Sequence, residues 1–485
     1  MGWLNSERFH QVERILWAAV LVALPVTTFR YMPLMGDAQV KPLSLIPAVL
    51  LLFVMVLMCF QKRRIVFWSG SLQPLVLFIL VAMISTAVGF YLAPIKLYST
   101  MYGARVLRAW VSLGVGLVFL IDSIHMNRDE TDLIFSIKWI YVGFVAEIVW
   151  SLMQQILSLH VLNSGLVMYT LMENLQRFLT NTGLPPNHRV SGLALEPSWL
   201  AAQILTLYLP WAVASLIKRY AWSKHRWINF AIIAGCAYLL IYSYSRSGIF
   251  TAIGVIFITL IIAGWDGIQQ VWKWMIAPFK KKIEHASRIL SAIFLRITII
   301  VVILAGLAGG IYILSRNSYF AKVWQSNKTT PVAYLVDISA GPRLAYAWAG
   351  WTIFTQHPLT GVGLGAAGFS IQKSLPDWAH FNIDEIAQLI SPDNTLFPNT
   401  KNLYIRLLSE TGIIGFWTFI TFYLLSMGKI LGLLRSKPKY LAFLGTASLI
   451  AWMGIVVFGI SQDSLAMPII WLPLGILIGM TDNST

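Results

Sequence analysis

Cysteine and acidic residues are both scarce in this 485-residue chain, which has two Cys and only 20 Asp and Glu beside 36 Lys and Arg. Cys59 and Cys236 lie in apolar stretches, so neither a disulfide framework nor a cysteine metal cluster can be inferred. Charged residues of both signs make up 12% of the chain, about half the usual share in a soluble protein. This scarcity of charge excludes an ordinary soluble fold.

Hydrophobic residues form 57% of the chain, and the mean hydropathy is +0.70. They recur in runs of about 15 to 22 residues, the length that crosses a hydrocarbon layer of roughly 30 Å as a helix. The sequence therefore predicts an all-α polytopic membrane protein, a single integral membrane domain over residues 1–485 with about twelve transmembrane helices. The expected spans are 15–30, 43–60, 74–93, 106–122, 133–158, 198–217, 227–244, 248–264, 297–315, 411–428, 441–460 and 466–480.

The placement of the basic residues predicts the orientation of these spans. A formal net charge of +16 could indicate a nucleic-acid partner, but the basic residues cluster in short connections, which is typical of cytoplasmic loops. We therefore expect no nucleic-acid partner. All the clusters follow even-numbered spans, so one orientation places them and both termini in the cytoplasm. The clusters are Lys62, Arg63 and Arg64; Lys218, Arg219, Lys224 and Arg226; Lys273, Lys280, Lys281, Lys282 and Arg288; and Lys429, Arg435, Lys437 and Lys439.

Two long connections then fall on the outer side, at residues 159–197 and 316–410. The longer one contains Pro358, alternating glycines up to Gly365 and nearly balanced charge. This composition predicts a folded loop with amphipathic helices and not a disordered tail.

On the cytoplasmic side, residues 266–294 carry Trp272, Trp274 and a run of lysines. This pattern is typical of an amphipathic segment that lies on anionic lipid headgroups, so we expect membrane lipids among the partners.

Lys96, Arg105 and Arg108 do not fit this orientation, because they lie on the predicted outer side or just inside the fourth span. Either that pair of spans is misassigned, or these cations are retained because they meet a phosphate.

Three further arginines lie at the predicted outer rim. Arg246 occupies a short turn between two spans, Arg189 precedes the point where the first outer loop re-enters the membrane, and Arg343 begins an amphipathic helix. Each guanidinium is a planar, permanently charged fork that matches phosphate oxygens. Together they predict a diphosphate pocket, although each alone could extend to lipid headgroups or pair with an acid.

Four short stretches, spread over residues 189 to about 430, form a pattern through their order and spacing. They are Arg189-Val190-Ser191-Gly192 with Glu196-Pro197-Ser198; Ser245-Arg246-Ser247-Gly248; Arg343 with His357-Pro358-Leu359-Thr360-Gly361-Val362-Gly363-Leu364-Gly365; and Lys401-Asn402-Leu403-Tyr404 with Glu410-Thr411-Gly412-Ile413-Ile414-Gly415. This pattern resembles the O-antigen ligase and O-antigen polymerase superfamily of bacterial envelope glycan enzymes.

The resemblance implies a large periplasmic loop over an outer-facing cavity, arginines that hold the diphosphate of an undecaprenyl-linked glycan, and a catalytic histidine near the end of the loop. This chain has Lys401-Asn402 where the family commonly has His-Asn. Lys401 is either a base, which requires a neutral amine, or a cation that binds phosphate. Because the resemblance implies that ligases hold the histidine more strictly, the lysine favours a polymerase.

Two glutamates leave alternatives open. Glu196, just ahead of Pro197, stabilises a helix N-terminus or accepts the proton of the attacking hydroxyl. Glu147, in mid-span with Gln154 and Gln155 further along, faces the cavity or is neutralised by a buried cation. The acids and histidines of the large loop lack metal-ligand spacing, so we expect no metal and no other cofactor.

These observations predict glycosyl transfer on the periplasmic side of the bacterial inner membrane, which polymerises polysaccharide repeat units. Lys401, Glu196 and Arg343 are the expected catalytic residues, and Arg189 and Arg246 join Arg343 and Lys401 on the diphosphate. The expected partners are the undecaprenyl-diphosphate-linked glycan and, as the resemblance implies, chain-length regulator and flippase proteins. The alternatives are a ligase that uses the lipid A core, a transporter of lipid-linked glycan, and an inactive scaffold.

Overall fold

The computed structural model describes residues 6–32, 35, 38–62, 70–92, 96–97, 100–158, 165–186, 189–277, 286–391 and 397–482. Nearly all of its regular structure is helical, which confirms the predicted all-α membrane fold. The helices are α1 (Ser6–Val22), α2 (Leu45–Lys62), η1 (Gly70–Leu72), α3 (Gln73–Leu92), α4 (Tyr102–Met126), α5 (Glu130–Ser158), α6 (Gly165–Thr180), α7 (Pro197–Gln203), η2 (Ile204–Tyr208), α8 (Leu209–Lys218), α9 (Trp227–Ser243), α10 (Arg246–Ile262), α11 (Trp265–Ile276), α12 (Ala286–Arg316), α13 (Ser318–Gln325), α14 (Pro331–Asp337), α15 (Gly341–Gln356), α16 (Gly368–Ile371), η4 (Gln372–Ser374), α17 (Asp377–Asn382), α18 (Asp384–Ile390), α19 (Leu403–Leu434), α20 (Lys439–Phe458) and α21 (Pro468–Asp482). The strands β1 (Lys96–Leu97) and β2 (Thr100–Met101) pair antiparallel.

Among the described residues, 7 helical stretches are long and apolar enough to cross a membrane. Shorter apolar helices, including α9 and α10, add to them. Each predicted span overlaps a helix, but the first is shifted, because α1 ends at Val22 whereas the predicted span continues to residue 30. Pro25 follows closely, and proline lacks the N–H that would continue a helix. The number of membrane crossings stays a prediction.

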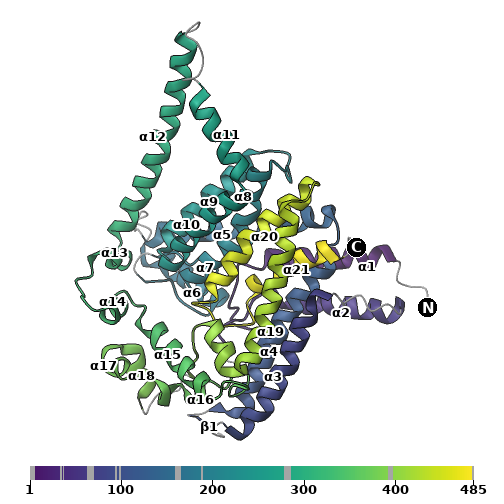
Figure 1. The fold of residues 1–485 in the computed structure, drawn as a ribbon, viewed down its shortest axis with the longest axis vertical. Helices are drawn as coiled ribbons and strands as arrows, with labels where there is room; N and C mark the ends of the chain where they lie inside the picture. The colour runs from purple at the N-terminus through teal and green to yellow at the C-terminus, as the bar shows by residue number, and fades with distance from the viewer. Residues whose placement is uncertain are drawn as a thin grey trace.

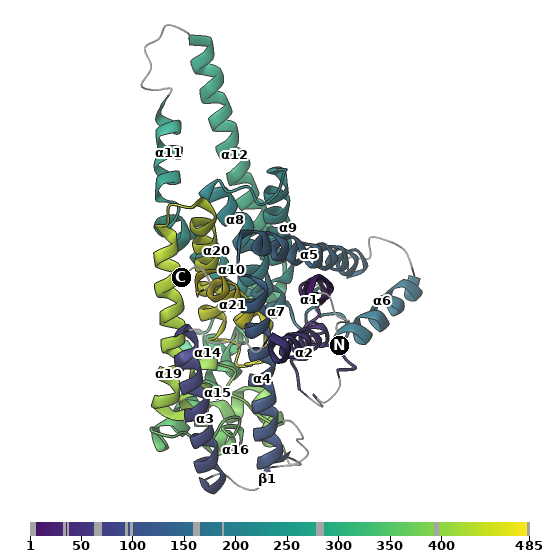
Figure 2. The same cartoon turned by 90° about the vertical axis from the view of Figure 1, so that its right-hand side faces the viewer.

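The helical bundle packs around its last helix, α21, which is buried along most of its length against α4 and α20 (Figures 1 and 2). Glycines allow this close approach. A Cβ atom at Gly475 would lie 2.5 Å from the Cβ of Ser123, and one at Gly479 would lie 2.5 Å from the carbonyl oxygen of Asn127. Small residues of this kind are the usual means by which membrane helices come together.

Helices α11 and α12 extend beyond the rest of the molecule at one end (Figures 1 and 2). Within α12, Arg296 and Arg316 bracket the apolar span predicted over 297–315. The segment predicted as amphipathic, 266–294, includes most of α11 and the start of α12, and its residues 278–285 lie outside the described part. Arg296 lies 4.4 Å from the ring centroid of Trp274, which links the two helices.

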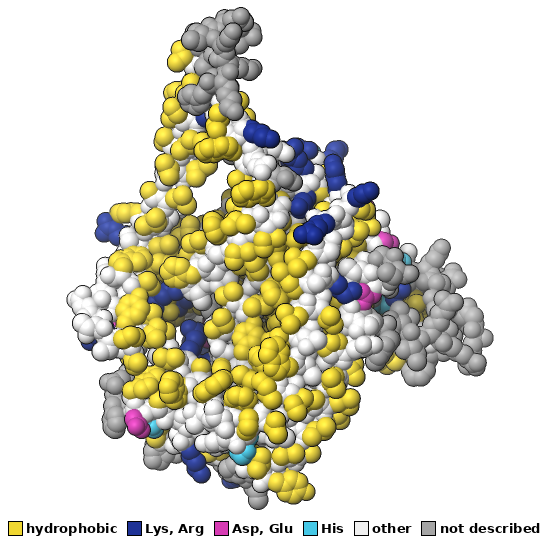
Figure 3. Space-filling model, in the orientation of Figure 1, with side chains coloured by type: hydrophobic (Ala, Val, Ile, Leu, Met, Phe, Trp, Pro, Cys, Tyr) yellow, Lys and Arg dark blue, Asp and Glu magenta, His cyan; other side chains and the backbone are white. Residues whose placement is uncertain are grey.

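Basic side chains gather at the end of the bundle where α8 joins α9 and α19 joins α20 (Figure 3). Lys218 ends α8 and Lys439 begins α20. The stretch expected as the large outer loop lies toward the other end and folds into α13 to α18 (Figure 1). It has its own hydrophobic core, formed by residues that include Tyr346, Ile353, Phe369 and Ile386. The location of this stretch outside the cell stays a prediction.

Helix α19 is broken at Gly412, whose backbone has φ 66° and ψ −172°. The loop at Pro358 to Gly363 packs against this break. The Ile413 N–H donates to the Pro358 carbonyl at 2.8 Å, and the Gly363 N–H donates to the Glu410 carbonyl at 2.9 Å. Backbone groups that the break frees are therefore satisfied within the protein, as membrane depth requires. Glu410 also forms a buried ion pair with Arg406 at 2.9 Å.

We predict that Gly412→Ala destabilises the protein by at least about 1–3 kcal/mol, because its positive φ strains an L-residue. The added methyl group would also meet the Leu359 carbonyl oxygen at 2.2 Å. The measurement is thermal unfolding of the purified protein in detergent. Gly428→Ala is the control, since Gly428 lies in the same helix with nothing within 4 Å of its would-be Cβ. Equal melting temperatures for the two variants would contradict the strained junction.

Candidate functional site

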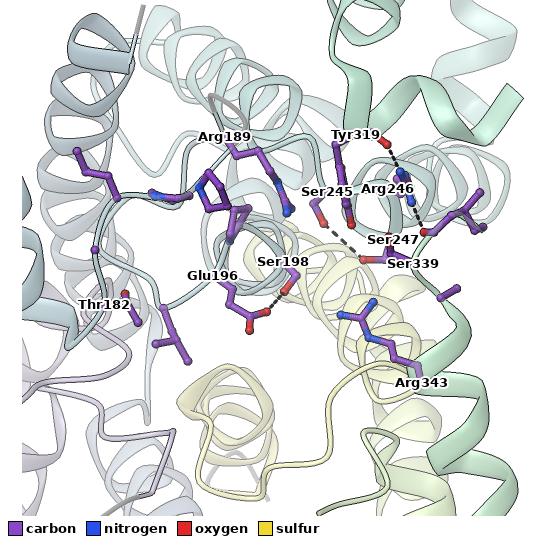
Figure 4. A pocket seen from close by; sticks show the side chains of 18 residues that line it. Thr182, Arg189, Glu196, Ser198, Ser245, Arg246, Ser247, Tyr319, Ser339 and Arg343 are labelled. Atoms are coloured by element: carbon purple, nitrogen blue, oxygen red, sulfur yellow. Dashed lines mark hydrogen bonds between the residues drawn. The ribbon is translucent and has the colours of Figure 1, made fainter. Parts of the chain in front are cut away.

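A cavity of about 520 Å³ opens between the start of α7, the start of α10 and the start of α15. Arg189, Arg246, Arg343 and Glu196 are among its lining residues, and Figure 4 shows their side chains around the same space. We call it the arginine cavity. Three arginines and one glutamate give its lining a net charge of +2. Residues far apart in the sequence thus form one cationic site, which is suited to a polyanion.

The loop that carries Arg189 to Glu196 is held by buried side chains of α5 and α6. The Leu193 N–H donates to the Glu147 carboxylate at 3.0 Å. Gln154 accepts from the Gly192 N–H at 2.9 Å and donates to the Gly192 carbonyl at 2.9 Å. Within the described residues, Glu147 therefore neither lines the arginine cavity nor meets a buried cation; it anchors the backbone of this loop.

Gly192 is required where it lies. Its φ is +60°, and a Cβ atom there would lie 1.4 Å from a carboxylate oxygen of Glu147. Glycine alone combines the left-handed backbone with this close approach.

Arg246 begins α10 immediately after a tight hairpin with α9. Tyr244 adopts a left-handed backbone conformation with φ 46°, and the Ser245 hydroxyl accepts from the Gly248 N–H at 3.2 Å to cap the helix. The two terminal nitrogens of Arg246 donate to the carbonyl oxygens of Ile338 and Tyr319. Arg246 thus ties the hairpin to the segment that leads into α15.

Arg189 lies beside the same ring as Arg246. The Tyr319 ring centroid is 4.5 Å from the Arg189 guanidinium carbon and 4.0 Å from that of Arg246, so both cations contact one aromatic ring. Arg189 also donates from Nε to the Ser243 carbonyl at 3.1 Å. Burial lowers the pKa of the Arg189 guanidinium from its ordinary value, and the positive charges of Arg246 and Arg343 act in the same direction. An anion between them would relieve this repulsion.

Arg343 and Glu196 are the less restrained members of the site. Arg343, in the first turn of α15, is exposed and has no hydrogen bond or ion pair within the described residues. Glu196 precedes α7, but its side chain does not cap that helix and instead accepts from the Ser198 hydroxyl at 3.1 Å. A carboxylate at this position can still stabilise the positive end of α7 without such a hydrogen bond, so both predicted roles stay predictions. Both side chains also line a second cavity.

The second cavity, of about 220 Å³, adjoins the first and contains Lys401. Lys401 has a left-handed backbone with φ 52°, and its N–H donates to the Asp463 carboxylate at 3.2 Å. Its ammonium forms an ion pair with Glu385 of α18 and lies 5.0 Å from the ring centroid of Tyr346. Lys401 is thus next to the arginine cavity and not inside it.

We call this second space the acidic cavity, because its three carboxylates outnumber its two cations. The carboxylates are those of Glu196, Glu385 and Asp463, and the cations are Arg343 and Lys401. Its net charge is therefore −1, opposite in sign to that of the arginine cavity.

The sequence reasoning missed Tyr319, Glu385 and Asp463. Tyr319 could have been noticed as an aromatic residue just after a predicted span, whereas no local pattern marks Glu385 or Asp463 as partners of Lys401. Arg105, which did not fit the predicted orientation, donates to the Gly365 carbonyl at 3.3 Å and lies 4.5 Å from the Phe397 ring centroid. Nowhere in the described ranges do three His, Cys, Asp or Glu side chains come close enough to hold a metal ion.

A family model described as O-antigen ligase matches residues 230–420. The match includes Arg246, Arg343 and Lys401, and it leaves Arg189 and Glu196 outside. It confirms the resemblance to the O-antigen ligase and polymerase superfamily that the sequence motifs indicated. No curated protein matches the chain.

We predict that Glu147→Ala lowers the stability by about 1–3 kcal/mol, because the buried Leu193 N–H loses its acceptor. Glu147→Gln keeps an acceptor oxygen, so its effect should be smaller. The measurement is again thermal unfolding in detergent. Val145→Ala is the control on the same helix, since the Val145 side chain is exposed on the bundle surface. A Glu147→Ala protein that melts like Val145→Ala would contradict the anchoring role.

Proposed function

We propose, on the premise that residues 230–420 form a domain of the O-antigen ligase family, that this membrane protein polymerises polysaccharide repeat units by glycosyl transfer. The donor is a glycan on undecaprenyl diphosphate, and the product is an envelope polysaccharide such as O-antigen, capsule or exopolysaccharide. The observation that carries this proposal is the meeting of Arg189, Arg246 and Arg343 in one cavity. Such a cluster of fixed cations suits a group whose negative charge grows as it leaves.

The distribution of charge supports a reaction on the periplasmic side. The basic connections after α8 and α19 lie at the opposite end of these helices from Glu196 and Lys401. Beyond the break at Gly412, the part of α19 that runs to Leu434 would alone span roughly 33 Å at about 1.5 Å per residue. Because basic connections favour the cytoplasm, the two cavities would face the periplasm of the bacterial inner membrane.

The proposed reaction joins two sugars in one displacement. An acceptor hydroxyl oxygen attacks the anomeric carbon, the bond from that carbon to the diphosphate oxygen breaks, and the diphosphate leaves with the electron pair. The hydroxyl proton passes to the Glu196 carboxylate, which lines both cavities. The guanidiniums of Arg343 and Arg189 stabilise the departing charge, and Arg246 fixes the wall of the cavity.

Lys401 suits the role of a cation better than that of a base. Its Nζ forms an ion pair with the Glu385 carboxylate, which is a contact that a cation makes. We therefore assign proton transfer to Glu196 and keep Lys401 as a cation of the acidic cavity, next to the arginine cavity.

The alternatives differ in acceptor or in class. A ligase would pass the glycan to the lipid A core, and Lys401 in place of the family's histidine favours the polymerase. A transporter of lipid-linked glycan would form no glycosidic bond. Against it, the folded stretch 316–410 has no counterpart in the first half of the chain, whereas many transporters are built from repeats.

We predict that Arg343→Ala lowers the rate of glycosyl transfer by about 10²–10³-fold, because a donor to the leaving group is lost. The assay uses purified full-length protein, a synthetic undecaprenyl-diphosphate-linked repeat unit as donor, and either a second such unit or lipid A core as acceptor. Arg316→Ala is the control, since this exposed arginine bonds only within α12 among the contacts described. Longer lipid-linked products support a polymerase. Transfer to lipid A core alone identifies a ligase, and an Arg343→Ala protein of wild-type rate would contradict the proposed site.

We also predict that the reaction survives EDTA, since arginines can stabilise the diphosphate without a divalent cation. The rate of the same assay would be measured before and after chelation. Loss of activity in EDTA that magnesium restores would count against this mechanism.

A further inference from the structure

The acidic cavity differs from its neighbour in more than charge. Amide side chains dominate its polar lining, and three aromatic side chains also line the cavity. The amides are Gln39, Gln388, Asn399 and Gln462, and the aromatic residues are Trp199, Tyr346 and Phe397. Amides and carboxylates hydrogen-bond hydroxyl groups, while an aromatic face packs against the carbon-bound hydrogens of a sugar ring. With about 220 Å³ against about 520 Å³, the cavity has room for one sugar residue more readily than for a chain.

Only some of the charged side chains that line the acidic cavity are neutralised by an ion-pair partner. Lys401 and Glu385 neutralise one another in their ion pair. Arg343 is shared with the arginine cavity, where a diphosphate would draw it. Of the lining carboxylates, those of Asp463 and Glu196 form no ion pair within the described residues. Behind this wall, Arg406 donates to the Asp463 backbone carbonyl at 2.7 Å and is itself paired with Glu410. An anionic ligand would be repelled there, since opposed like charges disfavour binding.

We propose, on the basis of the glycosyl transfer proposed above, that the acidic cavity binds the acceptor-end sugar and selects a neutral or amino sugar over one that carries a carboxylate. Glu196 lies on the boundary of both cavities. A hydroxyl of a sugar held in the acidic cavity thus reaches the proposed base, while the leaving diphosphate occupies the arginine cavity. Asp463 sets this specificity through its own charge, and Glu385 contributes by neutralising Lys401.

The test uses two probes that differ in one group, methyl β-D-glucopyranoside and its uronate, which has a carboxylate in place of the CH₂OH. Binding to the full-length protein in nanodiscs is measured by saturation-transfer NMR in the presence of saturating inorganic pyrophosphate, which occupies the arginine cavity and keeps the uronate out of it. We expect the uronate to bind about tenfold more weakly than the glucoside, a difference of ~1.4 kcal/mol. Asp463→Asn and, separately, Glu385→Gln should bring the two affinities closer together. Asp384→Asn is the matched control, because Asp384 is the preceding acid on α18 and does not line the cavity.

Equal binding of the two glycosides by the wild type would overturn the proposal, as would an unchanged preference in both Asp463→Asn and Glu385→Gln. Glu385→Gln removes an exposed carboxylate, so it remains informative if Asp463→Asn fails to fold. Binding of inorganic pyrophosphate to the wild type and to Arg343→Ala tests the diphosphate site separately. If pyrophosphate binds the wild type and not Arg343→Ala while neither glycoside binds, the acceptor site is wrong and the diphosphate site stands. If pyrophosphate binding does not depend on Arg343, the proposed function itself fails.

Discussion

The hydrogen bonds that Glu147 and Gln154 make with the backbone of residues 191–193 hold the position on which both cavities depend. Both side chains are buried within the bundle, where an unmet polar group costs free energy. Their partners are the amides and the carbonyl of a loop that would otherwise need water. The loop is therefore fixed at its centre. Its two ends carry Arg189 and Glu196, which both line the arginine cavity and face Arg246 and Arg343 across it.

The second constraint is the mutual repulsion of the arginines. Hydrogen bonds from Arg246 to backbone carbonyls offset this repulsion, as does the contact of Arg189 with the Tyr319 ring. Arg343, on the first turn of α15, is left as the exposed donor. Across the boundary formed by Arg343 and Glu196, the sign of the lining charge reverses. In the proposed glycosyl transfer, such a division would place the leaving diphosphate beside cations and the base beside other carboxylates, which are the surroundings that each requires.

Sequence patterns that act locally were sufficient to predict much of this. The apolar runs marked the helices, and Arg189, Arg246 and Arg343 could be chosen because charge at a membrane rim is costly. Local sequence patterns do not predict contacts between segments that are distant in the sequence. The sequence predicts that Glu147 faces the cavity or is neutralised by a cation. Its anchoring role depends on the positive φ of Gly192, 45 residues later by their numbering, and no local pattern indicates that contact. Likewise, no periodicity reveals that Glu385 pairs with Lys401, or that α12 extends beyond the bundle (Figure 1).

The most direct measurement is an experimental structure of the full-length protein in nanodiscs with undecaprenyl diphosphate bound. We expect density for both phosphates in the arginine cavity, within hydrogen-bonding distance of Arg343 and Arg189, with Glu196 on the side that leads to Lys401. Phosphate density elsewhere, at the basic end near Lys218 for example, would contradict the proposed diphosphate site.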